Sequence, residues 1–310
     1  MPLTTTPQGT PGAPAAPARP FGSVLVAMAT PFAADGEVDL DAAARLATTL
    51  VDAGCDGLVL SGTTGESPTT STGEKARLLG AVLEAVGARA HVLAGAGGND
   101  TAASVEAARA AEVAGAHGLL VVTPYYSRPP QAGLLAHFGA VADATGLPVM
   151  LYDIPGRTGT PIAVGTLQAL AEHPRVVAVK DAKNDLYAAS QVMANTDLAW
   201  YSGEDALNLA HLAQGAAGVV SVVGHAAAGA YRAMVDAVDA GDLPTARTLH
   251  ARLLPVVDLM MNRAQGAASA SAVAQLLGAT TSRAVRLPLL PLDEDQVEQL
   301  QGALTEAGLL

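Results

Sequence analysis

The sequence predicts an α/β protein, specifically a (β/α)8 TIM barrel with a C-terminal helical appendage. Between residues 23 and 221, eight short apolar runs alternate with Ala-rich amphipathic stretches of helical period. Eight strands joined by helices are the number that this barrel requires. The first apolar run lacks the glycine-rich dinucleotide fingerprint typical of a doubly wound sheet, which is the competing α/β architecture. The count and the missing fingerprint together favour the barrel.

Each expected element has its own pattern in the chain. The expected strands are short runs of β-branched and small apolar residues, namely Ser23–Thr30, Gly57–Ser61, His91–Gly95, Gly118–Thr123, Pro148–Tyr152, Val176–Lys180, Leu198–Ser202 and Gly218–Ser221. The expected helices between them are Leu40–Ala53, Gly73–Val86, Thr101–Ala114, Gln131–Ala144, Val164–Glu172, Leu186–Asn195 and Asp205–Gln214. Four helices follow a residue suited to N-capping, namely Asp39, Ser71, Asp100 and Asp185. Four end before a glycine suited to the left-handed C-terminal position, namely Gly54, Gly87, Gly115 and Gly146.

We expect the chain to divide into three regions. Residues 1–20 form a Pro/Ala-rich extension with six prolines, which we expect to be disordered because it cannot bury enough apolar surface. Residues 21–225 form the catalytic barrel. Residues 226–310 form a helical region without a strand signal, interrupted near Asp242–Pro244, Gly266 and Leu287–Pro288.

The composition argues against several classes of function. A net charge of −12 without a Lys/Arg cluster argues against a nucleic-acid partner. No apolar run is long enough to cross a membrane, and the start of the chain lacks the pattern of a signal peptide, so we expect a cytoplasmic protein. The single cysteine, Cys55, excludes an internal disulfide and is expected to be a packing residue. Seven scattered histidines lack ligand spacing, so we expect no metal, and no motif indicates a cofactor.

One of the three lysines in the chain ends an apolar strand. The run Val176–Asp181 consists of four apolar residues followed by Lys180 and an aspartate. Desolvation disfavours a charged amine, so we expect the pKa of a lysine at this position to fall below its solution value. A neutral amine is what Schiff-base catalysis needs. Taken alone, the run is also explained by a lysine that extends its amine to solvent, and it favours that explanation.

Polar residues follow several other expected strands, at the end of the barrel where active sites lie. Thr63 and Thr64 stand between two glycines in a turn that could bind a small anion or could be an ordinary loop. Tyr125 and Tyr126 lie between prolines, a pattern that is also common at interfaces. Tyr152 ends the fifth strand and is suited to carry protons.

The remaining strand ends complete this set. Arg157, five residues after Tyr152, offers a bidentate fork for a carboxylate. The seventh strand runs into Gly203, and the eighth contains Val220. An amine for a ketone, hydroxyls for protons and a guanidinium for a carboxylate together indicate chemistry on keto acids.

Four segments, in this order, resemble the 4-hydroxy-tetrahydrodipicolinate (dihydrodipicolinate) synthase family: Gly62–Ser67, Thr123–Tyr126, Tyr152–Thr158 and Lys180–Asp181. This family belongs to the pyruvate-dependent aldolase and lyase barrels that include N-acetylneuraminate lyase. The similarity covers about residues 22–310. It implies a lyase that condenses pyruvate with L-aspartate 4-semialdehyde in diaminopimelate and lysine biosynthesis. It also implies a homotetramer built as a dimer of dimers.

The resemblance implies a role for each matching residue. Lys180 would form the imine with pyruvate, and Tyr152 would relay protons through Thr64. Tyr126 would complete this relay by entering the site of a neighbouring subunit. The substrate-binding residues would be Thr63 and Thr64 at the pyruvate carboxylate, Arg157 at the carboxylate of the semialdehyde, and Gly203 and Val220.

The chain departs from the family in two places. Members that respond to lysine carry a His and a Glu where this chain has Thr72 and Ala103, although Asn99 is retained, so we expect weak or absent inhibition by lysine. The segment Asn262–Gly278 lacks a lysine that members often carry. Two alternatives remain: a related Schiff-base aldolase or dehydratase acting on N-acetylneuraminate or a 2-keto-3-deoxy sugar acid, and a non-catalytic small-acid-binding barrel. Arg157 disfavours the first, because a second carboxylate fork suits the semialdehyde better.

Overall fold

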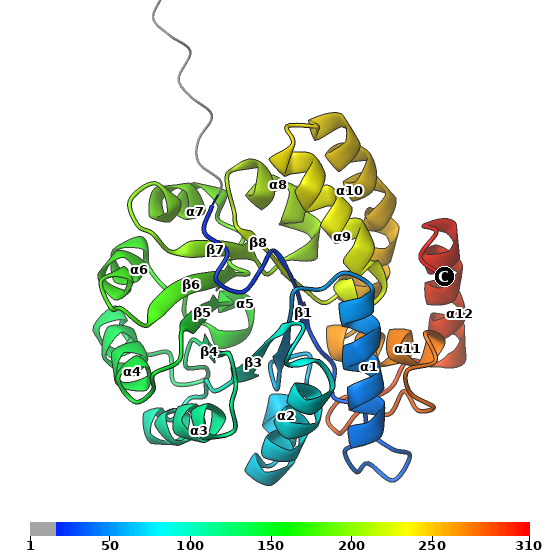
Figure 1. Cartoon of the computed structure of the whole chain (residues 1–310), viewed down its shortest axis with the longest axis horizontal. Helices are drawn as coiled ribbons and strands as arrows, with labels where there is room; N and C mark the ends of the chain where they lie inside the picture. Colours follow the sequence, from blue (N-terminus) through cyan, green and yellow to red (C-terminus); the bar gives the residue numbers. More distant parts are fainter. Residues whose placement is uncertain (1–16) are drawn as a thin grey trace, which may run out of the picture.

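The computed structural model describes residues 17–310, and within them eight parallel strands close into a barrel in chain order (Figure 1). The strands are β1 (Val24–Ala27), β2 (Gly57–Leu60), β3 (His91–Gly95), β4 (Gly118–Val122), β5 (Val149–Asp153), β6 (Val176–Asp181), β7 (Ala199–Ser202) and β8 (Gly218–Ser221). Each strand pairs with the next, and β8 pairs with β1 to close the ring. The predicted TIM barrel is confirmed.

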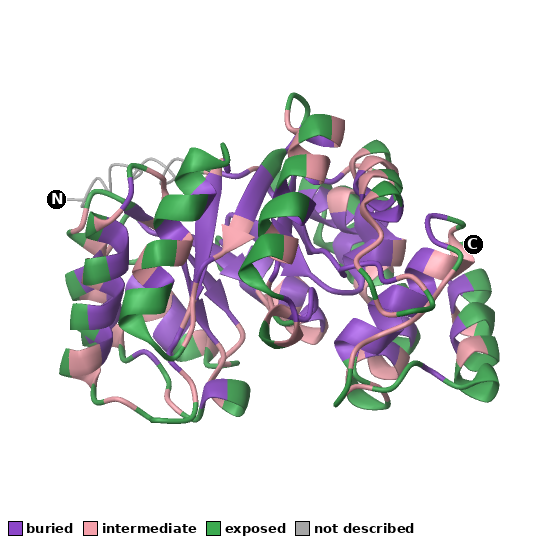
Figure 2. Cartoon of the chain, turned by 90° about the horizontal axis from the view of Figure 1, so that it is seen from below, coloured by how far each residue is buried: buried purple, intermediate pink, exposed green. Residues whose placement is uncertain are grey.

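Helices surround the barrel and continue beyond it. They are α1 (Leu40–Asp52), α2 (Thr72–Val86), α3 (Thr101–Val113), α4 (Gln131–Asp143), α5 (Pro155–Thr158), α6 (Val164–Ala171), α7 (Leu186–Met193), α8 (Asn208–Ala213), α9 (Gly224–Asp239), α10 (Leu243–Val257), α11 (Gly266–Leu276) and α12 (Glu294–Glu306). Shorter turns are η1 (Ser67–Thr69), η2 (Asp205–Leu207) and η3 (Asp258–Asn262). The central strands are buried and the outer helix faces are exposed (Figure 2).

The expected N-caps are confirmed, but two of the four glycines expected in the left-handed position after a helix do not adopt it. Asp39, Ser71, Asp100 and Asp185 each accept a hydrogen bond from the first turn of their helix. Gly54 and Gly115 have positive φ angles of 109° and 86°. Gly87 instead has a φ of −59°, because its N–H continues the helical bonding to the Leu83 carbonyl. The N–H of Gly146 donates to the Glu112 carboxylate at 2.9 Å, so a side chain stabilises this end without a left-handed residue.

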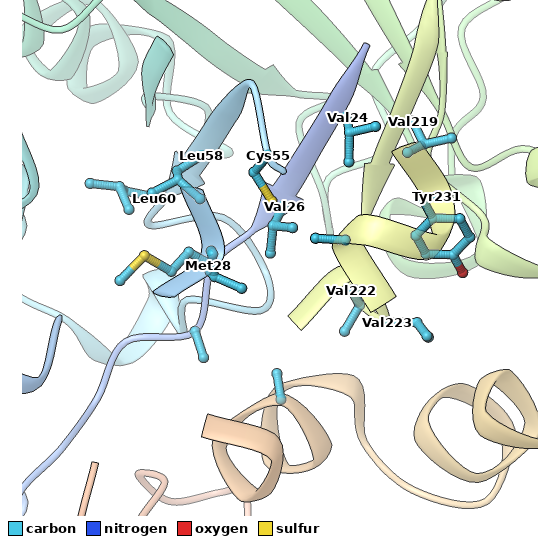
Figure 3. Packing of buried hydrophobic residues seen from close by; sticks show 14 of the residues in the cluster. Val24, Val26, Met28, Cys55, Leu58, Leu60, Val219, Val222, Val223 and Tyr231 are labelled. Carbon is cyan, nitrogen blue, oxygen red and sulfur yellow. The ribbon is translucent and has the colours of Figure 1, made fainter. Parts of the chain in front are cut away.

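Alternating residues of the strands form two separate apolar layers. One layer fills the barrel interior and includes Leu25, Met150 and Val220. The other lies between the strands and the surrounding helices, as seen where β1, β2, β8 and α9 meet (Figure 3). The Cys55 thiol is buried in this outer layer, and burial raises its pKa to about 12. Cys55 is therefore a packing residue, as expected.

The ends of the chain contact the barrel closely. α9 spans the expected boundary at residue 226 and packs against β1 and β8. Residues 1–16 of the expected extension lie outside the described residues. Its last residues belong to the fold, because Arg19 donates to the Ala217 carbonyl at 2.9 Å and forms an ion pair with Asp239. Across residues 17–310, none of the helices has both the length and the apolar character to span a membrane.

Candidate active site

Lys180 lies inside the barrel, near the C-terminal end of β6. Its register partners are Tyr152 on β5 and Tyr201 on β7, and only 3% of its surface is exposed. The Lys180 Nζ lies 4.3 Å from the centroid of the Tyr152 ring. Among residues 17–310, no side chain or carbonyl accepts a hydrogen bond from this amine. The lysine therefore does not extend to solvent, which removes the ordinary explanation of the strand-end cation.

Gly203 makes room for the Lys180 side chain. A Cβ at this position would lie 2.8 Å from Lys180 Cγ and 2.9 Å from Cε. The Gly203 N–H also donates to the Asp181 carbonyl at 2.7 Å, and this hydrogen bond holds the Gly203 backbone against the end of β6. Any larger residue would displace the amine. Val220, the other predicted residue on this side, is buried in the inner apolar layer.

The turn that contains the Thr pair is tightly bonded. The Glu66 N–H donates to the Thr63 carbonyl at 3.1 Å, and the Thr30 hydroxyl donates to the Gly65 carbonyl at 2.7 Å. A Cβ on Gly65 would lie 3.0 Å from the Met28 carbonyl oxygen, so a larger residue would have to displace this backbone. Thr64 is buried and Thr63 is exposed.

The C-terminal region holds this turn from outside the barrel. The Glu66 carboxylate accepts a hydrogen bond from the Arg286 N–H at 2.8 Å. Burial raises the pKa of Glu66, and the charge of Arg286 opposes this shift. The Arg286 guanidinium also pairs with Glu74 on α2, where its hydrogen bonds lower the pKa of that carboxyl to about 2. The segment that contains Arg286 therefore connects the Thr turn to α2.

A cavity of about 400 Å³ opens at this end of the barrel. Four predicted residues line it, namely Thr63, Tyr126, Tyr152 and Arg157. Arg157 is exposed on α5. Lys180 and Thr64 do not line this cavity. The Tyr152 ring lines it and also faces the Lys180 amine, so this tyrosine connects the open cavity with the buried nitrogen.

Tyr126 has an unusual conformation for an aromatic residue. It is 90% exposed and has a φ of +71°, in the left-handed region that non-glycine residues rarely adopt. Such strain persists only where the surroundings hold it, and it is common at functional sites. An exposed ring held in this way is suited to insert into another surface.

Sequence reasoning gave no role to Glu204, although this residue follows Gly203 directly. Glu204 is half-buried, and burial together with the neighbouring Asp205 raises its pKa, while the positive charge of Lys180 opposes the shift. Glu204 is therefore a carboxyl at the strand end beside Lys180 that interacts with the charge of this lysine. Its signal in the sequence was an acidic residue at the end of the strand beside the lysine strand.

A second cavity, of about 370 Å³, lies between α2 and α3. Its lining includes Thr72, Asn99 and Ala103, the positions considered for lysine feedback, and also Lys75 and Asp100. Asp100 accepts a hydrogen bond from the first turn of α3, so its charge is already used as a cap. Burial lowers the pKa of Lys75. The cavity therefore contains the Lys75 amine, whereas a bound lysine effector would need a negative charge there.

Comparison with known proteins identifies the family. A sequence model of the Dihydrodipicolinate synthetase family matches residues 20–307 of the chain. The chain belongs to this family. It is 64% identical over 295 residues to the 4-hydroxy-tetrahydrodipicolinate synthase of Kineococcus radiotolerans, which covers 95% of this chain and 96% of that protein. It is 57% identical over 295 residues to the synthase of Mycolicibacterium paratuberculosis, with coverage of 95% and 97%.

Solved structures of the family share the fold. A dihydrodipicolinate synthase from Bacillus anthracis superimposes with a TM-score of 0.88 at 39% identity, over 92% of this chain and 98% of that chain. The enzyme from Cyanidioschyzon merolae, solved with lysine bound, gives 0.90 at 39% identity, over 94% and 100%. The predicted function of a dihydrodipicolinate synthase, an enzyme of the lyase class, is confirmed. The sugar-acid aldolase and the non-catalytic barrel find no support in these relatives.

Proposed function

We propose that the protein condenses pyruvate with L-aspartate 4-semialdehyde through an imine on Lys180. The observation that supports this most strongly is the buried amine 4.3 Å from the Tyr152 ring, without an acceptor in the described part of the chain. In this mechanism the Nζ lone pair attacks C2 of pyruvate, and water leaves to give a protonated imine. Loss of a proton from C3 gives an enamine, which attacks the aldehyde carbon of the semialdehyde. The amino group of that substrate then displaces Lys180 from C2, which closes the ring and frees the lysine.

Hydroxyl groups move the protons that these steps require. Tyr152 is the first donor and acceptor, because its ring lies beside the amine and also lines the cavity. Thr64 carries the proton onward, and Tyr126 of a neighbouring subunit completes the chain. A relay made of phenols and a hydroxyl needs no buried charge. The 90% exposure of Tyr126 supports this arrangement, since a single subunit leaves the ring in water.

The two substrate carboxylates are bound by different groups. The N–H groups and hydroxyls of Thr63 and Thr64 bind the pyruvate carboxylate. Hydrogen bonds from Thr30 and Arg286 hold the turn that contains them. Arg157 at the cavity wall binds the carboxylate of the semialdehyde with its planar fork. Gly203 and Val220 shape the apolar side of the pyruvate site.

We further propose that the protein is cytoplasmic and acts as a homotetramer, a dimer of dimers in which each tight dimer exchanges Tyr126. The same assembly would cover the exposed Tyr126 rings. Sedimentation velocity at low and high concentration measures this state, and a monomer at all concentrations would contradict it.

Borohydride trapping tests the catalytic proposal. The protein is incubated with pyruvate, reduced, digested and analysed by mass spectrometry. We expect the pyruvate adduct on Lys180, and neither adduct nor turnover in Lys180→Ala. A wild-type protein without an adduct, or with the adduct on Lys75 or Lys183, would contradict it.

A further inference from the structure

Two buried carboxylates lie directly behind the proposed catalytic pair. Asp153 follows Tyr152 on β5, Asp181 follows Lys180 on β6, and the two aspartates are register partners. Both are completely buried. Because successive residues of a strand point to opposite faces, Tyr152 and Lys180 point into the barrel, whereas the aspartates point toward the helices.

Lys183 bonds to both aspartates. Its Nζ lies 3.1 Å from Asp153 Oδ2, and its backbone N–H donates to Asp181 Oδ1 at 2.9 Å. The same Nζ donates to the Ile162 carbonyl at 3.2 Å, while the Ile162 N–H donates to Asp153 Oδ1 at 3.1 Å. The loop after β6 and the segment before α6 are thus joined to the end of β5.

The other titratable groups around this cluster do not supply a positive charge. Burial raises the pKa of Asp153 and raises that of Asp181 to about 6, with the charge of Lys183 opposing both shifts. Asp185 adds further negative charge near Asp181. His211 of α8, whose Nε2 lies 3.8 Å from Asp181 Oδ2, is neutral at physiological pH because burial lowers its pKa to about 4. Within residues 17–310, Lys183 therefore supplies the compensating charge.

The backbone connects this cluster to the catalytic residues. The Ala182 N–H donates to the Asp153 carbonyl at 2.8 Å, and the Gly203 N–H donates to the Asp181 carbonyl at 2.7 Å. Without the positive charge of Lys183, Asp153 and Asp181 would repel each other. A shift of Asp181 would move Gly203, against which the Lys180 side chain packs.

We propose that Lys183 is a positioning residue whose ammonium compensates Asp153 and Asp181 and thereby holds the ends of β5 and β6 where Tyr152 faces the Lys180 amine. The inference rests on the proposed imine chemistry at Lys180. Lys183 acts through its neighbours and does not touch substrate. No sequence pattern indicated this role, since Lys183 occurs in a polar loop.

Four variants test the proposal, all measured as the rate of borohydride-trapped adduct on Lys180 at saturating pyruvate. Lys183→Met removes the charge and should slow trapping about tenfold or more, with little change in the pyruvate concentration at half-saturation. Lys183→Arg keeps the charge and should trap within about threefold of wild type. Lys183→Met combined with Asp153→Asn removes one charge of each sign and should recover most of the rate. Lys75→Met, the matched control, should behave as wild type, because Lys75 lies in the α2/α3 cavity.

The outcomes separate this inference from the proposed function. An unchanged trapping rate in Lys183→Met, or a loss in Lys183→Arg equal to that in Lys183→Met, would overturn the positioning role. If Lys183→Met does not fold, the Arg variant and the balanced double variant carry the test, and slow trapping in both would overturn it. Failure of the wild-type protein to form the Lys180 adduct would overturn the proposed function instead.

Discussion

Replacement of Gly203 by alanine tests the geometry around the amine with a single methyl group. The new Cβ would lie 2.8 Å from Lys180 Cγ, 2.9 Å from Lys180 Cε and 3.1 Å from the Asp181 carbonyl oxygen. Real Cβ atoms do not approach other atoms below about 3.0 Å, so something must shift. The carbonyl belongs to a paired strand and the lysine side chain is flexible, so the lysine moves.

The size of the effect follows from how the strain is relieved. Overpacking a buried site costs about 1–3 kcal/mol when the surroundings cannot adjust. Here the lysine adjusts, so the loss of folding stability should lie near the lower end of that range. A displacement of about 1 Å at a reacting atom can cost about 100-fold in rate. We therefore expect the trapping rate in Gly203→Ala to fall by about 10-fold to 100-fold.

Two measurements separate these effects. Borohydride trapping of pyruvate on Lys180 gives the rate, and urea unfolding gives the stability. The matched control is Gly80→Ala on α2, where an added Cβ meets nothing within 4 Å and should stabilise the helix by about 0.5–1 kcal/mol. Trapping in Gly203→Ala at the wild-type rate would show that Gly203 does not set the position of Lys180.

Four further predictions concern assembly, substrate binding, effectors and pH. Tyr126→Phe and Lys180→Ala should each lose synthase activity. A mixture allowed to exchange subunits should regain part of it, because a mixed dimer contains one site with Lys180 from the first variant and Tyr126 from the second. Arg157→Lys should raise the KM for the semialdehyde about tenfold or more without changing pyruvate trapping, since the bidentate fork is lost. Millimolar L-lysine should leave turnover almost unchanged, because Lys75 places an amine in the α2/α3 cavity. His211→Phe should lose less stability than wild type between pH 7 and pH 4, by at most about 3 kcal/mol, because the neutral imidazole has its folded pKa lowered to about 4.

Each of these has an outcome that contradicts it. Mixtures of the two inactive variants that stay inactive after proven subunit exchange would place Tyr126 outside the partner site. Equal increases of both KM values in Arg157→Lys would indicate a general distortion of the cavity. Strong inhibition by lysine would show that Asp100 can serve as its counter-charge. For His211, a lowered folded pKa contributes stability above pH 6.5 that is lost as pH falls toward 4, so equal acid sensitivity of the variant would exclude this contribution.

The barrel could be predicted because its signals are local. Each strand is a short apolar run between helices with recognisable caps, and all eight occur where the pattern indicated. The error at Gly146 came from a side chain that acts at a distance. Nothing near Gly146 reveals that Glu112 will bond to its N–H, and the helical pattern of α9 does not say that this helix packs on β1.

The candidate site was predictable to the extent that its residues stand at strand ends. Lys180, Tyr152 and Gly203 meet because parallel strands align their C-terminal ends. The supporting groups could not be predicted in this way. Arg286 reaches Glu66 across 220 positions of sequence, and no local pattern encodes such a contact.

At the ends of β5 and β6, successive residues place different groups on the two faces of the strands. On the inner face, the Tyr152 ring lies 4.3 Å from the Lys180 Nζ, beside the apolar inner layer. On the outer face, the next residues of the same strands carry the charges, and Lys183 compensates them. A carboxylate bonded directly to Lys180 would favour its ammonium form and reduce its nucleophilicity. In our proposal, the carboxylates therefore lie one residue further along, where they hold the strand ends without bonding to the Lys180 amine.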